Sequence, residues 1–164
     1  MPEPLLANLS VGGLVHHVAG VDALEAFRFP DETGALLEAG RRFGGALLLQ
    51  TCNRVELLVP ATGADLEAFL RESGRSGFTI AEGDAAVRHL LEVACGIDSM
   101  IMGEDQILGQ LRRALALSRE AGTLSPLLES CVTTAIHLGV EARRRTEINR
   151  GAVSIGSAAV QLAE

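Results

Sequence analysis

The spacing of the apolar residues changes at Gly83, and this change constrains the fold more than any other feature of the sequence. Before Gly83 the apolar residues form short runs separated by glycine, proline and polar residues, a pattern typical of strands alternating with short helices. After Gly83 they recur every three or four residues, as expected for amphipathic helices. The sequence therefore predicts an α+β protein with a mixed first half and a helical second half.

The first half, residues 1–82, is predicted to be a ferredoxin-like βαββαβ sandwich with helices on one face of a mainly antiparallel sheet. We expect strands within 5–21, 46–49, 55–59 and 77–80, and helices over 31–43 and 65–72. The pair Gly12-Gly13 is expected to form a tight turn inside the first of these segments. The polar insert 50–54 is expected to link two buried strands, and Pro60 to end the second of them.

The second half, residues 83–150, is predicted to contain three helices. Their expected starts are Asp84 as an N-cap, Gly103, and Ser125 followed by Pro126; their expected ends are Gly96, Gly122 and Arg145. Residues 151–164 are rich in glycine, alanine and serine and are expected to begin a further helix. That segment has no stop signal, so we expect the natural polypeptide to continue beyond it.

The composition narrows the classes of function. All 14 basic residues are arginine, which excludes a Schiff-base lysine and a P-loop lysine. The sequence has no GxGxxG motif for a dinucleotide, and Cys52, Cys95 and Cys131 lack the spacing of a metal site, so we expect free thiols and no metal. Neither an export signal nor an apolar run near the roughly 20 residues of a membrane span is present, so a cytoplasmic protein is expected. The net charge of -7 argues mildly against nucleic acid as a partner.

Cys52 is the most informative single position, because it lies in the polar insert between two predicted strands. The strands would fix the direction of a side chain that can still meet a ligand, and a cysteine thiolate is a strong nucleophile. Arg54 could favour the thiolate or, alternatively, bind a substrate carboxylate in a bidentate manner. The competing interpretation is a structural cysteine in a tight turn.

The segment 96–110 is the second candidate site. Its helix is expected to open at Glu104-Asp105-Gln106, where free backbone N–H groups can bind an anionic or carbonyl group. Gln106 and Gln110 are four residues apart and can therefore contact the same ligand. The alternative is a simple corner between two helices with an acidic first turn. His89, on the preceding helix, is by its pattern alone more often a packing residue.

Three motifs, in this order and spacing, strongly resemble glutamyl-tRNA reductase. They are Thr51-Cys52-Asn53-Arg54-Val55-Glu56, the stretch from His89 through Gly96 to Gln110, and Gly151-Ala152-Val153-Ser154. The resemblance covers essentially the whole chain but only the amino-terminal catalytic domain of that family. It implies that residues 1–82 carry the nucleophile, that 83–150 complete a glutamate pocket, and that 151–164 lead to an NADPH-binding domain beyond residue 164.

The resemblance also implies a thioester mechanism. Cys52 matches the nucleophile that attacks the ester of glutamyl-tRNA, and NADPH then reduces the thioester to glutamate-1-semialdehyde, the first committed step towards tetrapyrroles (porphyrins). His89 matches a histidine important for activity, with proton transfer and positioning both open as its role. The residues that match contacts to the glutamyl group are Thr51, Asn53, Arg54, Ser99, Glu104, Asp105, Gln106 and Gln110.

The partners implied by the resemblance are glutamyl-tRNA(Glu), a second copy in a homodimer of the full-length protein, and glutamate-1-semialdehyde aminotransferase. No association with a membrane is expected. Two alternatives stay open from the residues. One is a non-catalytic tRNA-binding or regulatory module of the same fold, and the other is a stand-alone thiol esterase.

Overall fold

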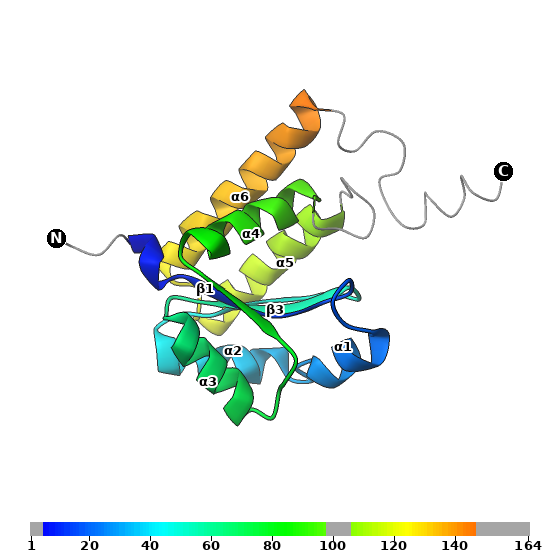
Figure 1. The fold of residues 1–164 in the computed structure, drawn as a ribbon. Helices are drawn as coiled ribbons and strands as arrows, with labels where there is room; N and C mark the ends of the chain where they lie inside the picture. The colour runs from blue at the N-terminus through cyan, green and yellow to red at the C-terminus, as the bar shows by residue number, and fades with distance from the viewer. Residues whose placement is uncertain (1–4, 98–105, 147–164) are drawn as a thin grey trace.

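The computed structural model describes residues 5–97 and 106–146, in which a four-stranded antiparallel sheet lies between two layers of helices (Figure 1). The strands are β1 (Ser10–Val15), β2 (Leu47–Gln50), β3 (Arg54–Val59) and β4 (Thr79–Glu82), in the order β2-β3-β1-β4 across the sheet. The helices are a short 3-10 helix (Leu5–Asn8), α1 (Val21–Phe27), α2 (Glu32–Phe43), α3 (Gly63–Glu72), α4 (Asp84–Cys95), α5 (Gln106–Ala121) and α6 (Pro126–Arg145). The predicted combination of an antiparallel sheet with helices is confirmed.

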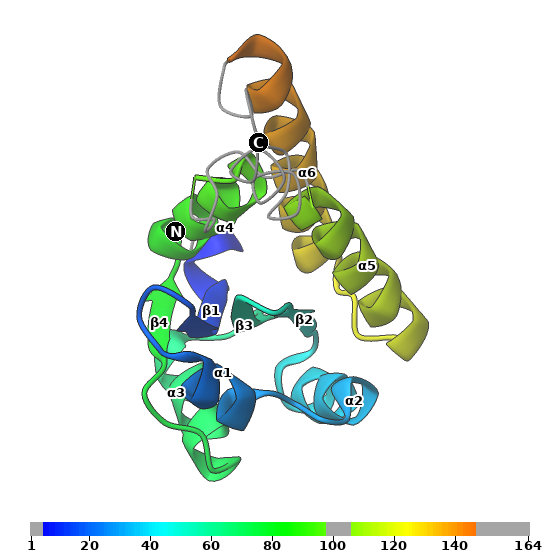
Figure 2. The same ribbon diagram turned by 90° about the vertical axis from the view of Figure 1, so that its right-hand side faces the viewer.

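Helices cover both faces of the sheet. Helices α1–α3 lie on one face and α4–α6 on the other (Figure 2). Successive side chains of a strand point to opposite faces, so Val55, Leu57 and Val59 of β3 pack with α1–α3 while Leu58 packs with α4–α6. The sequence predicted α2 and α3 of the first layer but not α1. The second arises because the strands are apolar on both faces, which leaves a surface that the helical half buries.

The segment before α1 contains a single strand, so the predicted turn at Gly12-Gly13 is wrong. Both glycines lie inside β1, opposite Leu57 and Glu56 of β3. A Cβ atom on Gly13 would lie 1.9 Å from the carbonyl oxygen of Val55. Glycine is therefore required here by the close approach of two backbones, which is a second common reason for glycine in a strand.

The ends of the helices mostly follow the local sequence. The side chains of Asp31 and Ser125 accept hydrogen bonds from backbone N–H groups at the starts of α2 and α6, and Gly96 and Gly122 follow α4 and α5 in the left-handed conformation. Asp84 is the first residue of α4 and makes no side-chain cap, so its predicted capping role is wrong. Within the described ranges, no helix is long and apolar enough to cross a membrane.

Candidate functional site

The polar insert is the tip of a hairpin formed by β2 and β3. The N–H of Thr51 donates to the carbonyl of Arg54 at 2.8 Å, which leaves Cys52 and Asn53 at the tip. Cys52 is exposed and carries a free thiol, whereas Thr51 and Arg54 on either side are buried. Two paired strands therefore hold the position of Cys52 while its side chain stays accessible.

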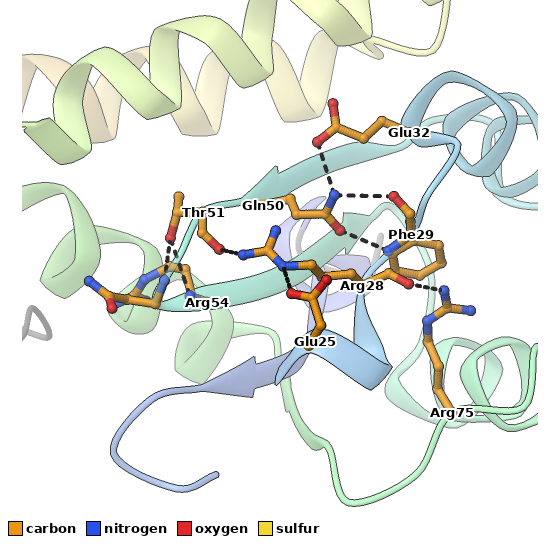
Figure 3. Close-up of polar contacts among 9 residues, drawn as sticks. Glu25, Arg28, Phe29, Glu32, Gln50, Thr51, Arg54 and Arg75 are labelled. Atoms are coloured by element: carbon orange, nitrogen blue, oxygen red, sulfur yellow. Dashed lines mark hydrogen bonds and ion pairs between the residues drawn. The ribbon is translucent and has the colours of Figure 1, made fainter. Parts of the chain in front are cut away.

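Thr51 closes the tip with its side chain. Its Oγ1 accepts the N–H groups of Asn53, at 3.1 Å, and Arg54, at 3.2 Å. In an ordinary β-turn the carbonyl of the first residue accepts the N–H of the fourth, but here the threonine hydroxyl takes that N–H. The Thr51 carbonyl instead accepts a hydrogen bond from Nη2 of Arg28, the residue that follows α1 (Figure 3).

Two more side chains hold the connection between α1 and α2: Gln50 links it to the hairpin, and Arg75 links it to the segment after α3 (Figure 3). The amide of Gln50 exchanges hydrogen bonds with the backbone of Phe29, donating at 3.1 Å and accepting at 2.8 Å. Arg75 donates to the carbonyl of Arg28 at 2.8 Å and lies with its guanidinium 3.5 Å from the centroid of the Phe29 ring. The local sequence pattern does not mark Arg28, Gln50 or Arg75 as site residues, because their partners are remote in the chain.

A chain of three hydrogen-bonded side chains, the first two of them buried, leads from the hairpin to α4. Arg54 and Glu56 occupy alternate positions of β3 and so share a face of the sheet. Nη1 of Arg54 donates to Oε2 of Glu56 at 3.1 Å, and these side chains are only 3% and 7% exposed. The other carboxylate oxygen of Glu56 is hydrogen-bonded to Nε2 of His89. Glu56 is therefore a site residue that was not predicted from the sequence. Its position two residues after Arg54 on a predicted strand does indicate that the two side chains share a face.

Glu56 is charged in spite of its burial. Burial alone raises the pKa of its carboxyl, but the hydrogen bond and charge of His89, together with those of Arg54, outweigh it, so that the pKa lies below the ordinary value of 4.5. The carboxylate therefore holds two basic side chains at once, one on the strand behind the tip and one on α4.

The predicted glutamyl contacts that the structure describes lie at the hairpin and on α5. Thr51, Asn53 and Arg54 lie at the hairpin, and the backbone carbonyl of Asn53 accepts the N–H of His16 at 2.8 Å. Gln106 is the exposed first residue of α5, and Gln110 is half-buried one turn further on. The predicted residues that lie outside the described ranges are Ser99, Glu104 and Asp105.

The other two cysteines are half-buried free thiols, Cys95 on α4 and Cys131 on α6. Burial raises the pKa of the Cys131 thiol, so its nucleophilic thiolate form is less populated. Among the residues that the structure describes, no three histidine, cysteine or acidic side chains are grouped to hold a metal ion. Cys52 is thus the exposed thiol of the described chain.

Comparison with known proteins places these features in context. Residues 13–146 match the family model described as glutamyl-tRNAGlu reductase, N-terminal domain. A glutamyl-tRNA reductase of Methanoculleus marisnigri is 59% identical over 164 residues, and one of Methanospirillum hungatei is 50% identical over 164 residues; each alignment covers 100% of this chain and 39% of the relative. The solved structure of glutamyl-tRNA reductase from Methanopyrus kandleri matches with a TM-score of 0.83 and 41% identity, covering 96% of this chain and 40% of that one. The chain thus spans about two fifths of the length of these relatives.

Proposed function

Because the chain belongs to the glutamyl-tRNA reductase family, as its amino-terminal domain, we propose that it binds the glutamyl group of glutamyl-tRNA(Glu) and transfers that group to Cys52. Within the whole protein this step would precede an NADPH-dependent reduction to glutamate-1-semialdehyde for tetrapyrrole biosynthesis. One observation carries the proposal: an exposed thiol lies at the tip of a hairpin, and the next strand positions carry the buried Arg54 and Glu56, which connect through a hydrogen bond to His89 on α4.

The proposed step is an acyl transfer. The Cys52 sulfur, as thiolate, forms a bond to the carbonyl carbon of the ester, and the carbonyl electron pair moves to oxygen. When that pair returns, the carbon–oxygen bond to the tRNA ribose breaks, and the ribose oxygen takes up a proton. Glutamate is left on sulfur as a thioester, which is more reactive than the ester it replaces.

We assign Glu56 a positioning role in this step, since it would act through Arg54 and His89. A buried carboxylate that receives both side chains limits their rotation, as the carboxylate of a catalytic triad orients its histidine. The hydrogen bond from Nε2 supports positioning as one role of His89. The proposed contacts to the glutamyl group remain Thr51, Asn53, Arg54, Ser99, Glu104, Asp105, Gln106 and Gln110.

NADPH supplies the hydride when bound, but the sequence has no GxGxxG and the described sheet is antiparallel, whereas that class of dinucleotide site lies on a parallel sheet. These residues therefore do not fit NADPH, and we propose that the cofactor is bound by another part of the protein, to which residues 151–164 lead.

We also propose an arrangement for each half of the chain and partners for the full-length protein. The strand order β2-β3-β1-β4 with antiparallel neighbours supports a ferredoxin-like arrangement for residues 1–82. Residues 83–150 would complete the glutamate pocket. A homodimer of the full-length protein and glutamate-1-semialdehyde aminotransferase as a partner are proposed from the family resemblance alone. A cytoplasmic location is proposed from the sequence pattern described above.

The experiment that tests acyl transfer uses glutamyl-tRNA carrying radiolabelled glutamate. The protein should release tRNA and retain label on Cys52, and Cys52→Ser should abolish both, whereas Cys131→Ser, which changes a half-buried thiol, should not. If Cys52→Ser releases tRNA as fast as the parent, Cys52 is not the nucleophile. Binding of tRNA without acylation would indicate a regulatory module, and hydrolysis of small glutamyl esters without tRNA would indicate a thiol esterase.

A further inference from the structure

We propose that the backbone N–H of Cys52 is a donor of an oxyanion hole for the acyl transfer, and that Arg28 is a positioning residue that aims it. The inference rests on the proposed function, because an oxyanion forms only when the Cys52 sulfur attacks an ester carbonyl. It adds a hydrogen-bond donor for the reacting carbonyl oxygen, a role that we assign neither to the Cys52 thiol nor to the Arg54–Glu56–His89 chain.

The orientation of this N–H follows from the peptide unit that joins Thr51 to Cys52. Nη2 of Arg28 donates to the carbonyl oxygen of that peptide (Figure 3). The described part of the chain contains no cis peptide bond, so the N–H of Cys52 points away from the Thr51 carbonyl and hence away from Arg28. A guanidinium that holds the oxygen of a planar peptide therefore sets the direction of the N–H on its other side.

Arg28 is itself held in place. Its Nε donates to Oε2 of Glu25 at 3.1 Å, and its backbone carbonyl accepts a hydrogen bond from Arg75 at 2.8 Å (Figure 3). The Arg28 side chain is 26% exposed, so it is partly shielded from water. An arginine fixed at both its backbone and its guanidinium can hold a carbonyl without moving during the reaction, which is the condition for electrostatic preorganisation.

The other N–H groups of the tip are already used inside the hairpin. The N–H groups of Asn53 and Arg54 donate to Oγ1 of Thr51, and the N–H of Thr51 donates to the carbonyl of Arg54. Within the described residues the N–H of Cys52 donates to no protein group, and the residue is exposed. Because Oγ1 of Thr51 accepts the N–H groups of Asn53 and Arg54, the N–H of Cys52 is available to a bound molecule.

A donor on the nucleophilic residue suits the reaction geometry. As the carbon–sulfur bond forms, the carbonyl electron pair moves onto oxygen, and that oxygen lies within a few ångströms of the backbone of the attacking residue. Serine proteases use the N–H of the nucleophile in this way, together with a second donor. Removing one such donor slows the chemical step by about 100-fold to 1,000-fold, so misdirecting it should slow acylation by about 10-fold to 100-fold.

The test compares Arg28→Ala and Arg28→Lys with the parent in single-turnover acylation by glutamyl-tRNA. We expect Arg28→Ala to lower the acylation rate at saturating glutamyl-tRNA by about 10-fold to 100-fold, with a half-saturating concentration within about twofold of the parent. Arg28→Lys, which can still donate to the Thr51 carbonyl, should recover part of the rate. Glu25→Gln removes the ion pair that holds the Arg28 guanidinium but keeps the Thr51 contact, so it should slow acylation less than Arg28→Ala does. Arg119→Ala, which breaks an exposed ion pair on α5, should match the parent.

Alkylation of Cys52 by iodoacetamide distinguishes an oxyanion donor from a merely structural arginine. Alkylation displaces iodide and develops no oxyanion. Iodoacetamide should therefore alkylate Cys52 in the Arg28→Ala protein at a rate within about twofold of that in the parent. The inference is overturned if acylation and alkylation slow together, if acylation is unchanged, or if only the half-saturating concentration rises. Failure of the proposed function looks different, because the parent itself would then not be acylated. Circular dichroism shows whether the Arg28→Ala protein is folded. If it is not, the acylation and alkylation rates of Arg28→Gln are compared with those of the parent in its place.

Discussion

The buried carboxylate of Glu56 offers the sharpest test of how the site is held together. Replacing Glu56 with glutamine keeps the volume of the side chain but removes its charge. The Arg54 guanidinium, which is 3% exposed, therefore loses its ion pair with the Glu56 carboxylate, 3.1 Å away. Breaking a buried ion pair costs about 3–5 kcal/mol, and glutamine still accepts one hydrogen bond, so we expect a loss of about 3 kcal/mol in the free energy of unfolding at pH 7.

Urea denaturation followed by circular dichroism measures this loss. With a denaturant dependence of about 2 kcal/mol per molar urea, the midpoint of Glu56→Gln should fall by about 1.5 M. Glu67→Gln is the matched control, because it also removes a carboxylate from an arginine but on the exposed face of α3, where such a pair contributes about 0.3–0.5 kcal/mol.

The pH dependence gives an independent check. The pKa of Glu56 is lowered in the folded protein, so its carboxylate contributes stability that is complete above the ordinary value of 4.5 and is lost as the pH falls through the lower folded value. The difference between the parent and Glu56→Gln should therefore be largest near neutral pH and should shrink below about pH 4.5. Equal losses for Glu56→Gln and Glu67→Gln, or a difference that does not change with pH, would refute the reasoning.

Two further predictions concern the strand beside the site and the thiols. Gly13→Ala should destabilise the protein by at least about 1–3 kcal/mol, because its Cβ would lie 1.9 Å from the Val55 carbonyl oxygen. Gly20→Ala, with no atom within 4 Å of the added Cβ, should change the urea midpoint little. Similar midpoints for both variants would contradict the close approach of β1 and β3. Iodoacetamide at neutral pH should modify Cys52 before Cys131, because Cys52 is exposed while burial raises the pKa of Cys131, and peptide mass spectrometry that finds Cys131 modified first would disprove this.

Much of the architecture could be predicted because its causes are local. The apolar runs on either side of residues 50–54 form β2 and β3, and the predicted hairpin places Cys52 at an exposed tip. The capping side chain of Ser125 and the glycine at 122 mark ends of α6 and α5 that depend only on neighbouring backbone groups. The second helical layer was not predicted, since periodicity shows that a helix has an apolar face but not which surface that face will cover.

The sequence by itself determined the α+β class, the hairpin and the residue types at its tip, because strand alternation, turn residues and caps act over a few positions. Tertiary structure alone decided what surrounds that tip. The contacts from Arg28 to Thr51 and from His89 to Glu56 join residues 23 and 33 positions apart, and they form only when α1 and α4 pack on opposite faces of one sheet. Hydrogen bonds between such remote side chains leave no periodic trace in the sequence, so the groups that orient the tip could be identified only from the folded chain.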